Sequence, residues 1–290
     1  MKPEGISSRP GQLKNGKKAM QKGISTYTYT WAVGVPGSMP ETPMTADSLI
    51  SKAADLGVDC VQLADNLPLA GMDTGALAEI RNHARQLRIN IEVGGRGLTE
   101  ENLHQHIDLA FFFGSPVLRM VIDGKNYEPD LDTIVAVIRN ALGTLESSQV
   151  TLALENHDRL HAATFREIVE WTGSRFTGIC LDCVNSMGIG EGIDTVAEIL
   201  APYTVNLHIK DFTVKRVSPK MGFVLEGAPA GKGLLDLQTI LEKIRPYNRC
   251  HSAILELWTP PAVTLADTLE REDSWARESI AYINKILAKP

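Results

Sequence analysis

The sequence lacks the features that mark membrane-spanning, secreted or nucleic-acid-binding chains. No apolar run approaches the ~18 residues that a membrane span requires. The amino-terminal residues are polar and basic, without the apolar segment of a secretory signal. Acidic residues outnumber basic ones, 35 to 29, which argues against a surface for phosphate backbones. We therefore expect no membrane partner and no nucleic-acid partner.

Cysteine is scarce as well. The four cysteines are Cys60, Cys180, Cys183 and Cys250, too few for a disulfide framework in a chain of 290 residues. Cys180 and Cys183 form a CxxC pair, but it lies within an apolar run that reads as a strand, where a redox role is not expected. These features predict a reducing, cytoplasmic setting.

From residue 24 onward, short β-rich runs alternate with longer segments of helical periodicity. The predicted strand and helix pairs are 24–30 and 46–56, 58–64 and 73–87, 89–93 and 99–113, 116–122 and 130–146, 150–155 and 161–172, 176–182 and 193–200, 204–210 and 235–245, and 252–258 and 267–287. Strict alternation implies a parallel sheet with helices outside, and eight units predict a single-domain (β/α)8 TIM barrel. An open doubly wound sheet is the rival, although no GxGxxG motif follows the first strand.

No linker or change of composition divides the alternating region. We therefore expect a loose basic tail over residues 1–22 and one barrel domain over residues 23–290. The longest irregular segment, 211–233, is of a length that is usually functional or disordered, and we expect it to cover the substrate or to reach a neighbouring subunit. Its end, EGAPAGKG at 226–233, fits either a phosphate cradle or a structural turn.

The last four predicted strands all end in residues that bind protons or metals. The strand VTLAL runs into Glu155, GICL into Asp182, and AIL into Glu256, while VNLHIK carries His208 near its end. In a barrel these ends share one face, and period-two alternation lets all four side chains point into its mouth. Three carboxylates and an imidazole are costly to bury together unless a cation joins them. An oxygen-rich set favours Mn²⁺ or Mg²⁺, with Co²⁺ or Zn²⁺ as alternatives.

The order Glu, Asp, His, Glu in ALENHD, CLDCVNS, LHIKD and ILELW resembles the sugar phosphate isomerase/epimerase family of the xylose isomerase-like TIM barrel superfamily. The resemblance covers residues 24–287 and is strongest over the last four strands. It implies that Glu155, Asp182, His208 and Glu256 hold one divalent metal, most often Mn²⁺. It also implies that Glu155 and Glu256 flank a sugar substrate and exchange protons with it. Family members are often dimers or tetramers, so a homo-oligomer is expected.

Two positions depart from the family pattern. Asn185 stands where the epimerases have a histidine, and Val214 stands where they have an arginine. These differences count against ketose 3-epimerase activity and leave the metal ligands untouched. We predict a metal-dependent isomerase or epimerase acting on a sugar or keto-sugar through a metal-stabilised enediolate. The alternative is a lyase, dehydratase or deglycosylase that uses the same enolate chemistry.

Five further residues are candidate substrate contacts. His157 either acts on a substrate oxygen or orients Glu155, and Lys210 either binds substrate or pairs with Asp182 or Glu256. Asn185 either touches substrate or caps a turn. Arg96 lies in the glycine-rich GGRGL, and Trp258 offers an apolar wall, as does Trp31, which alternation would place on one face with Tyr27 and Tyr29.

Two other classes of function compete with a sugar enzyme. A nuclease of the endonuclease IV type resembles this barrel but needs a histidine-rich three-metal cluster, and only His157 and His208 of the seven histidines fall in the strand-end motifs. A non-catalytic binding barrel would not require paired acid and base groups such as Glu155 and Glu256.

Overall fold

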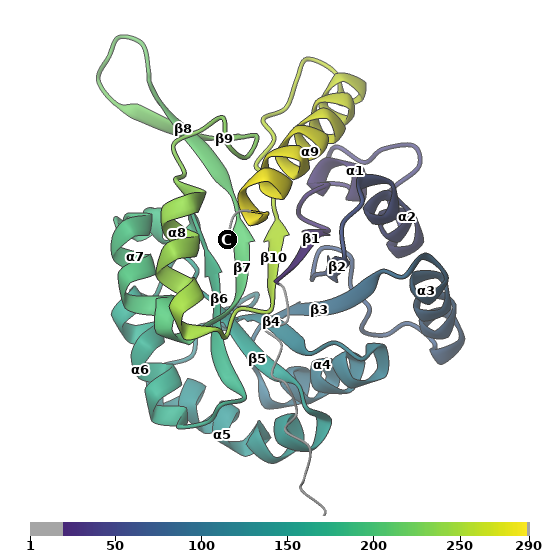
Figure 1. The fold of residues 1–290 in the computed structure, drawn as a ribbon, viewed down its shortest axis with the longest axis vertical. Coiled ribbons are helices and arrows are strands. Elements are labelled where there is room, and N and C mark those ends of the chain that lie inside the picture. The colour runs from purple at the N-terminus through teal and green to yellow at the C-terminus, as the bar shows by residue number, and fades with distance from the viewer. Residues whose placement is uncertain (1–19, 289–290) are drawn as a thin grey trace, which may run out of the picture.

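A computed structural model of the protein describes residues 20–288. Its core is a closed barrel of eight parallel strands in the order β1-β10-β7-β6-β5-β4-β3-β2, with helices around the outside (Figure 1). The barrel strands are β1 (Gln21–Ser25), β2 (Cys60–Leu63), β3 (Asn90–Arg96), β4 (Val117–Val121), β5 (Thr151–Glu155), β6 (Thr177–Asp182), β7 (Thr204–Ile209) and β10 (Ser252–Leu255). The predicted (β/α)8 TIM barrel is confirmed.

The helices bury one face each against the barrel, as their apolar periodicity predicts. They are α1 (Thr30–Val33), α2 (Ala46–Leu56), α3 (Thr74–Leu87), α4 (Glu100–Phe113), α5 (Leu131–Ser148), α6 (Ala162–Thr172), α7 (Ile193–Leu200), α8 (Leu237–Ile244) and α9 (Leu265–Leu287), with short 3₁₀ turns at Asn185–Ile189, Ala201–Tyr203 and Arg245–Tyr247. Thr45 and Ser48 form a capping box at the start of α2, and Gly57 ends it with a positive φ of 65°. Among residues 20–288, no helix is long and apolar enough to cross a membrane.

The first strand differs from its prediction. It begins at Gln21 and ends at Ser25, so the range 24–30 was wrong, and the strand also takes two residues from the predicted tail 1–22. The alternating TYTYT turns instead, because Thr28 accepts a hydrogen bond from the Ser25 amide and donates its own amide to the Ser25 carbonyl. The rest of the predicted tail, residues 1–19, lies outside the described residues.

The three aromatic side chains of this segment therefore do not share one face. The Tyr27 hydroxyl donates to Asp65, and the Tyr29 hydroxyl donates to Asp273. Trp31 lies in α1, and its indole donates to the Thr259 carbonyl at 2.8 Å. Of the three, Tyr27 alone lies at the mouth of the barrel.

The segment 211–233 is more regular than expected. It forms the antiparallel pair β8 (Asp211–Arg216) and β9 (Phe223–Ala228), a hairpin that projects beyond the barrel after β7 (Figure 1). The base of the hairpin packs tightly against Trp258, three residues beyond the end of β10, since a Cβ at Gly227 would lie 2.1 Å from the Trp258 carbonyl oxygen. Only glycine fits this approach.

Candidate active site

The four predicted metal ligands converge at the carboxyl end of the barrel. Glu155 is the last residue of β5, Asp182 is the last of β6, His208 lies in β7, and Glu256 follows β10 directly. The register pairs Asp182 with His208 and His208 with Ile254, which brings these side chains to one depth. None of the four is more than 2% exposed. The sequence pattern therefore placed four buried polar groups together correctly.

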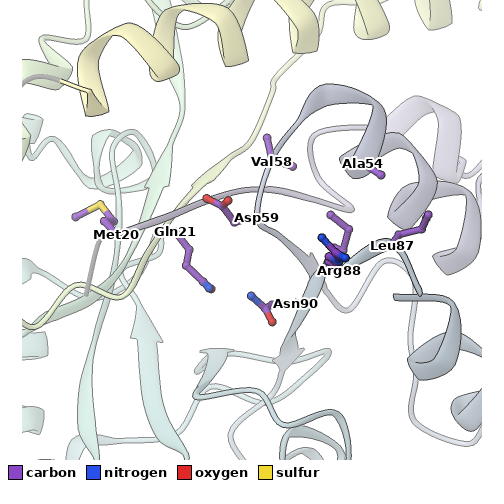
Figure 2. A pocket seen from close by; sticks show the side chains of 9 residues that line it. Met20, Gln21, Ala54, Val58, Asp59, Leu87, Arg88 and Asn90 are labelled. Atoms are coloured by element: carbon purple, nitrogen blue, oxygen red, sulfur yellow. The ribbon is translucent and has the colours of Figure 1, made fainter. Parts of the chain in front are cut away.

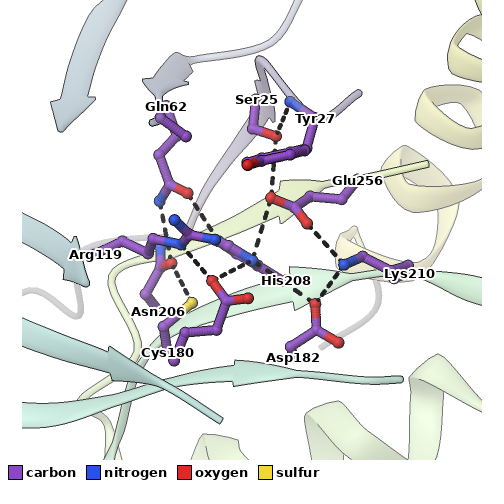
Figure 3. A network of polar contacts seen from close by, with 12 residues as sticks. Ser25, Tyr27, Gln62, Arg119, Cys180, Asp182, Asn206, His208, Lys210 and Glu256 are labelled. Carbon is purple, nitrogen blue, oxygen red and sulfur yellow. Dashed lines mark hydrogen bonds and ion pairs between the residues drawn. The ribbon is translucent and has the colours of Figure 1, made fainter. Parts of the chain in front are cut away.

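The imidazole of His208 is the centre of this cluster. Its Nδ1 lies 3.3 Å from Glu256 Oε1, 3.5 Å from Glu155 Oε2 and 3.9 Å from Asp182 Oδ2 (Figure 3). The buried His208 Nδ1 has no hydrogen-bond partner, whereas the buried Asp182 Oδ2 is ion-paired with Lys210 Nζ at 2.9 Å. An unpartnered nitrogen that faces three carboxylates fits a cation between them, because burying these groups together is costly.

Within residues 20–288, two groups of three side chains could hold a metal ion, with ligand atoms within 4.8 Å of one another. One is Asp182, His208 and Glu256, and the other is Glu155, Cys180 and His208. The donor atoms of the predicted set are carboxylate oxygens and one imidazole nitrogen, which suits a hard or borderline divalent ion. The residues present therefore fit such an ion.

Lys210 follows β7 and bridges two of the carboxylates. Its Nζ lies 2.9 Å from both Asp182 Oδ2 and Glu256 Oε2, and 5.2 Å from the centre of the Trp258 ring. Burial opposes the ammonium, but the charges of Asp182 and Glu256 outweigh it and raise the pKa of Lys210. Burial likewise opposes ionisation of Glu256, yet His208 and Lys210 lower its pKa to about 2. Lys210 therefore carries its proton while Glu256 is ionised.

Arg119 was missed by the sequence analysis. Its side chain is buried in β4, where Nε donates to Glu155 Oε2 in an ion pair and an NH group donates to Asp65 Oδ1 at 2.9 Å. The signal was an arginine in the middle of the apolar run VLRMV, which cannot stay buried without a charged partner. Arg119 lies in the middle of the fourth strand, so it does not belong to the pattern at the ends of the last four strands.

Asp65, two residues beyond β2, was missed too. Its Oδ2 accepts from Arg96 Nε at 3.1 Å and from the Tyr27 hydroxyl at 3.0 Å, while Oδ1 accepts from Arg119. Burial opposes its ionisation, but the two guanidinium groups prevail and lower the pKa of Asp65. Asp65 therefore holds two arginines side by side at the mouth of the barrel.

The side chain of Asn185 contacts Glu155 and does not cap the turn Asn185–Ile189 that it begins. Its Nδ2 donates to Glu155 Oε1 at 2.8 Å, and its backbone amide donates to Asp182 Oδ1 at 2.8 Å. His157 does not orient Glu155 in the part of the chain that the structure describes. Instead its Nδ1 lies 3.1 Å from Asp158, and its Nε2 lies 3.5 Å from Arg96.

A hollow of about 170 Å³ opens above the cluster. All five predicted substrate contacts line it: Arg96, His157, Asn185, Lys210 and Trp258. The remaining lining residues are Tyr27, Arg119, Glu155, Asp158 and Glu256. The predicted contacts thus surround one small polar space, while Trp31 lies elsewhere.

A larger hollow of about 460 Å³ lies at the opposite end of the barrel (Figure 2). It is lined near the amino ends of β1 to β3 by residues that include Gln21, Asp59, Arg88 and Asn90. Catalytic groups of TIM barrels lie at the carboxyl face, and the amino face serves stability. We therefore place the candidate active site in the smaller hollow, beside the ionisable cluster.

The turn at 226–233 does not offer a phosphate cradle. The backbone amides of Gly231, Gly233 and Leu235 already donate to the carboxylate of Asp211, at 2.8 to 3.0 Å. Asp211 is 1% exposed, so the anion in this cradle is supplied by the chain itself. The contacts therefore favour a structural turn over a phosphate site.

Comparisons with known proteins agree with this architecture. Residues 50–286 match the model of the xylose isomerase-like TIM barrel family. A 3-oxo-isoapionate decarboxylase from Pectobacterium atrosepticum is 30% identical over 264 residues, which cover 91% of this chain and 95% of that protein.

Two solved structures show the same fold at low identity. One is a xylose isomerase-like TIM barrel protein from Mycobacterium smegmatis in complex with magnesium, with 13% identity, a TM-score of 0.69, and coverage of 93% of this chain and 98% of that one. The other is a D-psicose 3-epimerase in the presence of D-fructose, with 16% identity, a TM-score of 0.69, and coverage of 92% and 99%. The resemblance read from the strand ends is confirmed: the chain belongs to the xylose isomerase-like TIM barrel family.

Proposed function

We propose that this protein is a divalent-metal-dependent lyase that decarboxylates a 3-oxo sugar acid. The observation that carries the proposal is Arg96, whose guanidinium lines the hollow with 35% of its side chain exposed, while the other two cations there, Arg119 and Lys210, are already paired with carboxylates of the chain. An accessible guanidinium suits a substrate carboxylate. The decarboxylase relative, which acts on a 3-oxo sugar acid by its name, supports the same substrate class.

The metal would be held by Glu155, Asp182, His208 and Glu256, with Mn²⁺ or Mg²⁺ preferred for an oxygen-rich set and Co²⁺ or Zn²⁺ as alternatives. When bound, such an ion supplies a Lewis acid that polarises the substrate carbonyl and stabilises negative charge on its oxygen. Lys210, protonated between Asp182 and Glu256, adds a second positive charge beside that oxygen.

Arg96 is the residue that we assign to the substrate carboxylate. It is 35% exposed in its side chain, and its Nε is fixed by Asp65, so the guanidinium is both oriented and accessible. Loss of CO₂ breaks the bond between the carboxylate carbon and its neighbour and leaves that electron pair on the carbonyl oxygen. His157, at the same mouth, then gives a proton to the carbon and recovers one from water.

Isomerase or epimerase activity is the second candidate. It is favoured by the paired carboxylates Glu155 and Glu256 beside the hollow, which could exchange a substrate proton from two sides. Against it stands the buried ion pair between Glu155 and Arg119, which holds that carboxylate where a mobile base was expected. The substituted position Asn185 is also bound to Glu155 rather than free.

One experiment separates the two. The purified protein with Mn²⁺ is given 3-oxo-isoapionate and, separately, D-fructose or D-tagatose in D₂O, and NMR follows both CO₂ loss and exchange of the proton next to the carbonyl. Decarboxylation supports the lyase, and exchange without CO₂ loss supports the isomerase. If neither occurs with metal bound, a non-catalytic barrel becomes the better description.

Variants sharpen the assignment of Arg96. Arg96→Met is expected to raise KM for the acid substrate by about 10- to 100-fold, because a charge-assisted contact of roughly 1.5–3 kcal/mol is lost. Arg139→Met, an arginine on the outer helix α5, is the matched control and should leave KM unchanged. An unchanged KM in Arg96→Met would remove Arg96 from the carboxylate site.

We also propose that the protein works in the cytoplasm as a homo-oligomer. The four cysteines are all free thiols, and Cys60, Cys180 and Cys183 are buried, which suits the reducing cytoplasmic location expected from the sequence. A homo-oligomer is proposed from family membership. Gel filtration with light scattering tests it, and a monomer at micromolar concentration would contradict it.

A further inference from the structure

A layer of polar side chains fills the barrel interior directly beneath the candidate metal site. Gln62 on β2, Glu92 on β3, Asn206 on β7 and Ser252 on β10 are each at most 1% exposed. Barrel interiors are usually packed with branched aliphatic residues, and burying polar groups is costly unless each is hydrogen-bonded. A role in the site would account for such a layer.

Glu92 is the anchor of this layer. Its Oε1 accepts from the Ser252 hydroxyl at 2.5 Å, and its Oε2 accepts from Gln62 Nε2 at 3.1 Å and from Asn206 Nδ2 at 3.2 Å. Among residues 20–288, no cationic side chain forms an ion pair with it. Burial raises the pKa of Glu92, and these three donors oppose that rise. The carboxyl is therefore held by neutral amides and a hydroxyl.

These contacts fix which way the Gln62 amide points. Its nitrogen faces two acceptors, Glu92 Oε2 at 3.1 Å and Asn206 Oδ1 at 3.2 Å. Its oxygen must therefore point away from them, and it lies 2.8 Å from His208 Nε2 (Figure 3). Gln62 and Glu92 are register partners on adjacent strands, so the arrangement is built into the sheet.

The orientation of Gln62 decides where the His208 ring carries its proton. An amide oxygen can only accept a hydrogen bond, so His208 Nε2 must be the protonated nitrogen. The other nitrogen, Nδ1, is the one that faces the three carboxylates and has no hydrogen-bond partner. A metal ligand needs that nitrogen free of a proton.

We propose that Gln62, oriented by Glu92, is a positioning residue that keeps the His208 proton on Nε2 and so presents Nδ1 to the metal. The inference rests on the proposed metal site, which contains His208 as a ligand. It differs from a purely structural role, in which the layer would only fill the barrel. In that case a substitution would change stability and leave metal affinity unaltered.

The first test compares Mn²⁺ affinity in Gln62→Met and in the wild type by isothermal titration calorimetry on the metal-free proteins. Methionine keeps the length of the side chain but removes both the acceptor and the donor. We expect affinity to fall by about 10- to 100-fold, as is typical when a partner of a metal-bound histidine is lost. Cys60→Ser, another buried change on β2, is the control and should bind Mn²⁺ like the wild type.

A swap of the two partners provides the rescue. In Gln62→Glu combined with Glu92→Gln, the carboxylate and the amide exchange strands, so that position 62 still offers an oxygen to His208 and the charge of the layer is kept. Mn²⁺ affinity should recover most of the loss seen in Gln62→Met. A swap that binds as poorly as Gln62→Met would overturn the inference, because its acceptor is present.

NMR on the wild type covers the case in which the variants do not fold. Long-range ¹H–¹⁵N correlation spectra of the metal-free and Zn²⁺-loaded protein should show the proton of His208 on Nε2 in both. A deprotonated Nε2 in either spectrum, or equal Mn²⁺ affinity in a folded Gln62→Met, would overturn the inference alone. Failure of the wild type itself to bind Mn²⁺ or Zn²⁺ would instead remove the metal site on which the proposed function depends.

Discussion

Arg119 is the residue on which the charge balance of the candidate site depends. It pairs with Glu155 and with Asp65, and its side chain is only 2% exposed. Replacing it with methionine would leave the buried Glu155 without its cation, while Asp65, whose side chain is 22% exposed, would keep its pair with Arg96. Breaking a buried pair in this way costs about 3–5 kcal/mol. We therefore expect Arg119→Met to lower the free energy of unfolding of the metal-free protein by that amount.

Urea unfolding, with and without Mn²⁺, is the measurement. Added Mn²⁺ should reduce the loss in Arg119→Met, because a bound cation compensates Glu155. The exposed Arg139→Met is the control, with an effect within about 0.5 kcal/mol. A loss of similar size in Arg139→Met would show that the effect of Arg119 does not come from its pair with the buried Glu155.

Removal of the Lys210 charge should strengthen metal binding. The Lys210 ammonium lies 2.9 Å from oxygens of Asp182 and Glu256, two of the proposed ligands, so it repels a divalent cation. Removing a unit charge at such short range changes the interaction by more than about 1.4 kcal/mol even in a screened site. Lys210→Met should therefore bind Mn²⁺ at least about ten-fold more tightly, while kcat falls because the charge beside the substrate oxygen is lost.

Calorimetry gives the affinity, and the decarboxylation assay gives kcat. The matched control is Lys243→Met, whose ion pair with Glu198 lies on the outer helices. Weaker Mn²⁺ binding in Lys210→Met would mean that Lys210 orders the ligands more than it repels the ion.

At the scale of elements, the junction between α1 and α9 contains a pH-sensitive contact. Glu272 on α9 is 1% exposed and accepts from the backbone amides of Trp31 and Ala32 at 2.9 and 3.0 Å. Burial outweighs these two hydrogen bonds and raises the pKa of Glu272 from 4.5 to about 7. The folded protein therefore binds this proton more tightly than the unfolded chain does.

The sign of the effect follows from linkage. The contribution of Glu272 is fully present below pH 4.5 and is lost as the pH rises through about 7. The free energy of unfolding should fall by roughly 2–3 kcal/mol across this window from this group alone. Urea unfolding at several pH values, in the wild type and in Glu272→Gln, isolates the effect. The same pH dependence in both proteins would assign it to other groups.

The β8–β9 hairpin fixes the conformation of the turn that follows it. Asp211, the first residue of β8, binds three backbone amides of the following turn and so fixes the chain between β9 and α8. Gly227 brings the base of the hairpin against Trp258 at the mouth of the site. The base of the hairpin therefore packs against Trp258, which lines the hollow of the candidate active site. That this segment covers the substrate stays a prediction.

At the scale of the whole molecule, metal binding should appear as stability. The four proposed ligands come from β5, β6, β7 and the end of β10, which span the second half of the barrel. A ligand that binds only the folded state stabilises it by about 2.7 kcal/mol when present at 100 times its Kd. For a domain of this size we expect Mn²⁺ to raise Tm by about 5 °C or more.

The double variant Glu155→Gln/Glu256→Gln should lose this shift, together with the roughly one equivalent of metal that we expect elemental analysis to find in the wild type. Thermal unfolding with EDTA and with Mn²⁺ gives both readings. A wild type without bound metal and without a thermal shift would contradict the metal site, and the cluster around His208 would then be a set of ion pairs.

The sequence by itself determined the barrel and the place of the four proposed ligands. Its alternation of strand and helix periods is set by local geometry, and parallel strands must place Glu155, Asp182, His208 and Glu256 at one end. The turn within TYTYT could not be predicted in the same way, because hydrogen bonds of Ser25 and Thr28 compete with an equally alternating strand.

Only the tertiary structure decided which polar side chains form hydrogen bonds and ion pairs with one another around the candidate site. The partners of Arg119, Asp65 and Gln62 come from strands that are far apart along the chain, and no local pattern encodes those contacts. The same holds for the turn at 226–233. Its sequence fits either a phosphate site or a structural turn, and only the structure shows that its backbone amides bind the carboxylate of Asp211. Periodicity fixes the face on which a side chain lies, whereas its hydrogen-bond partner depends on how the whole barrel closes.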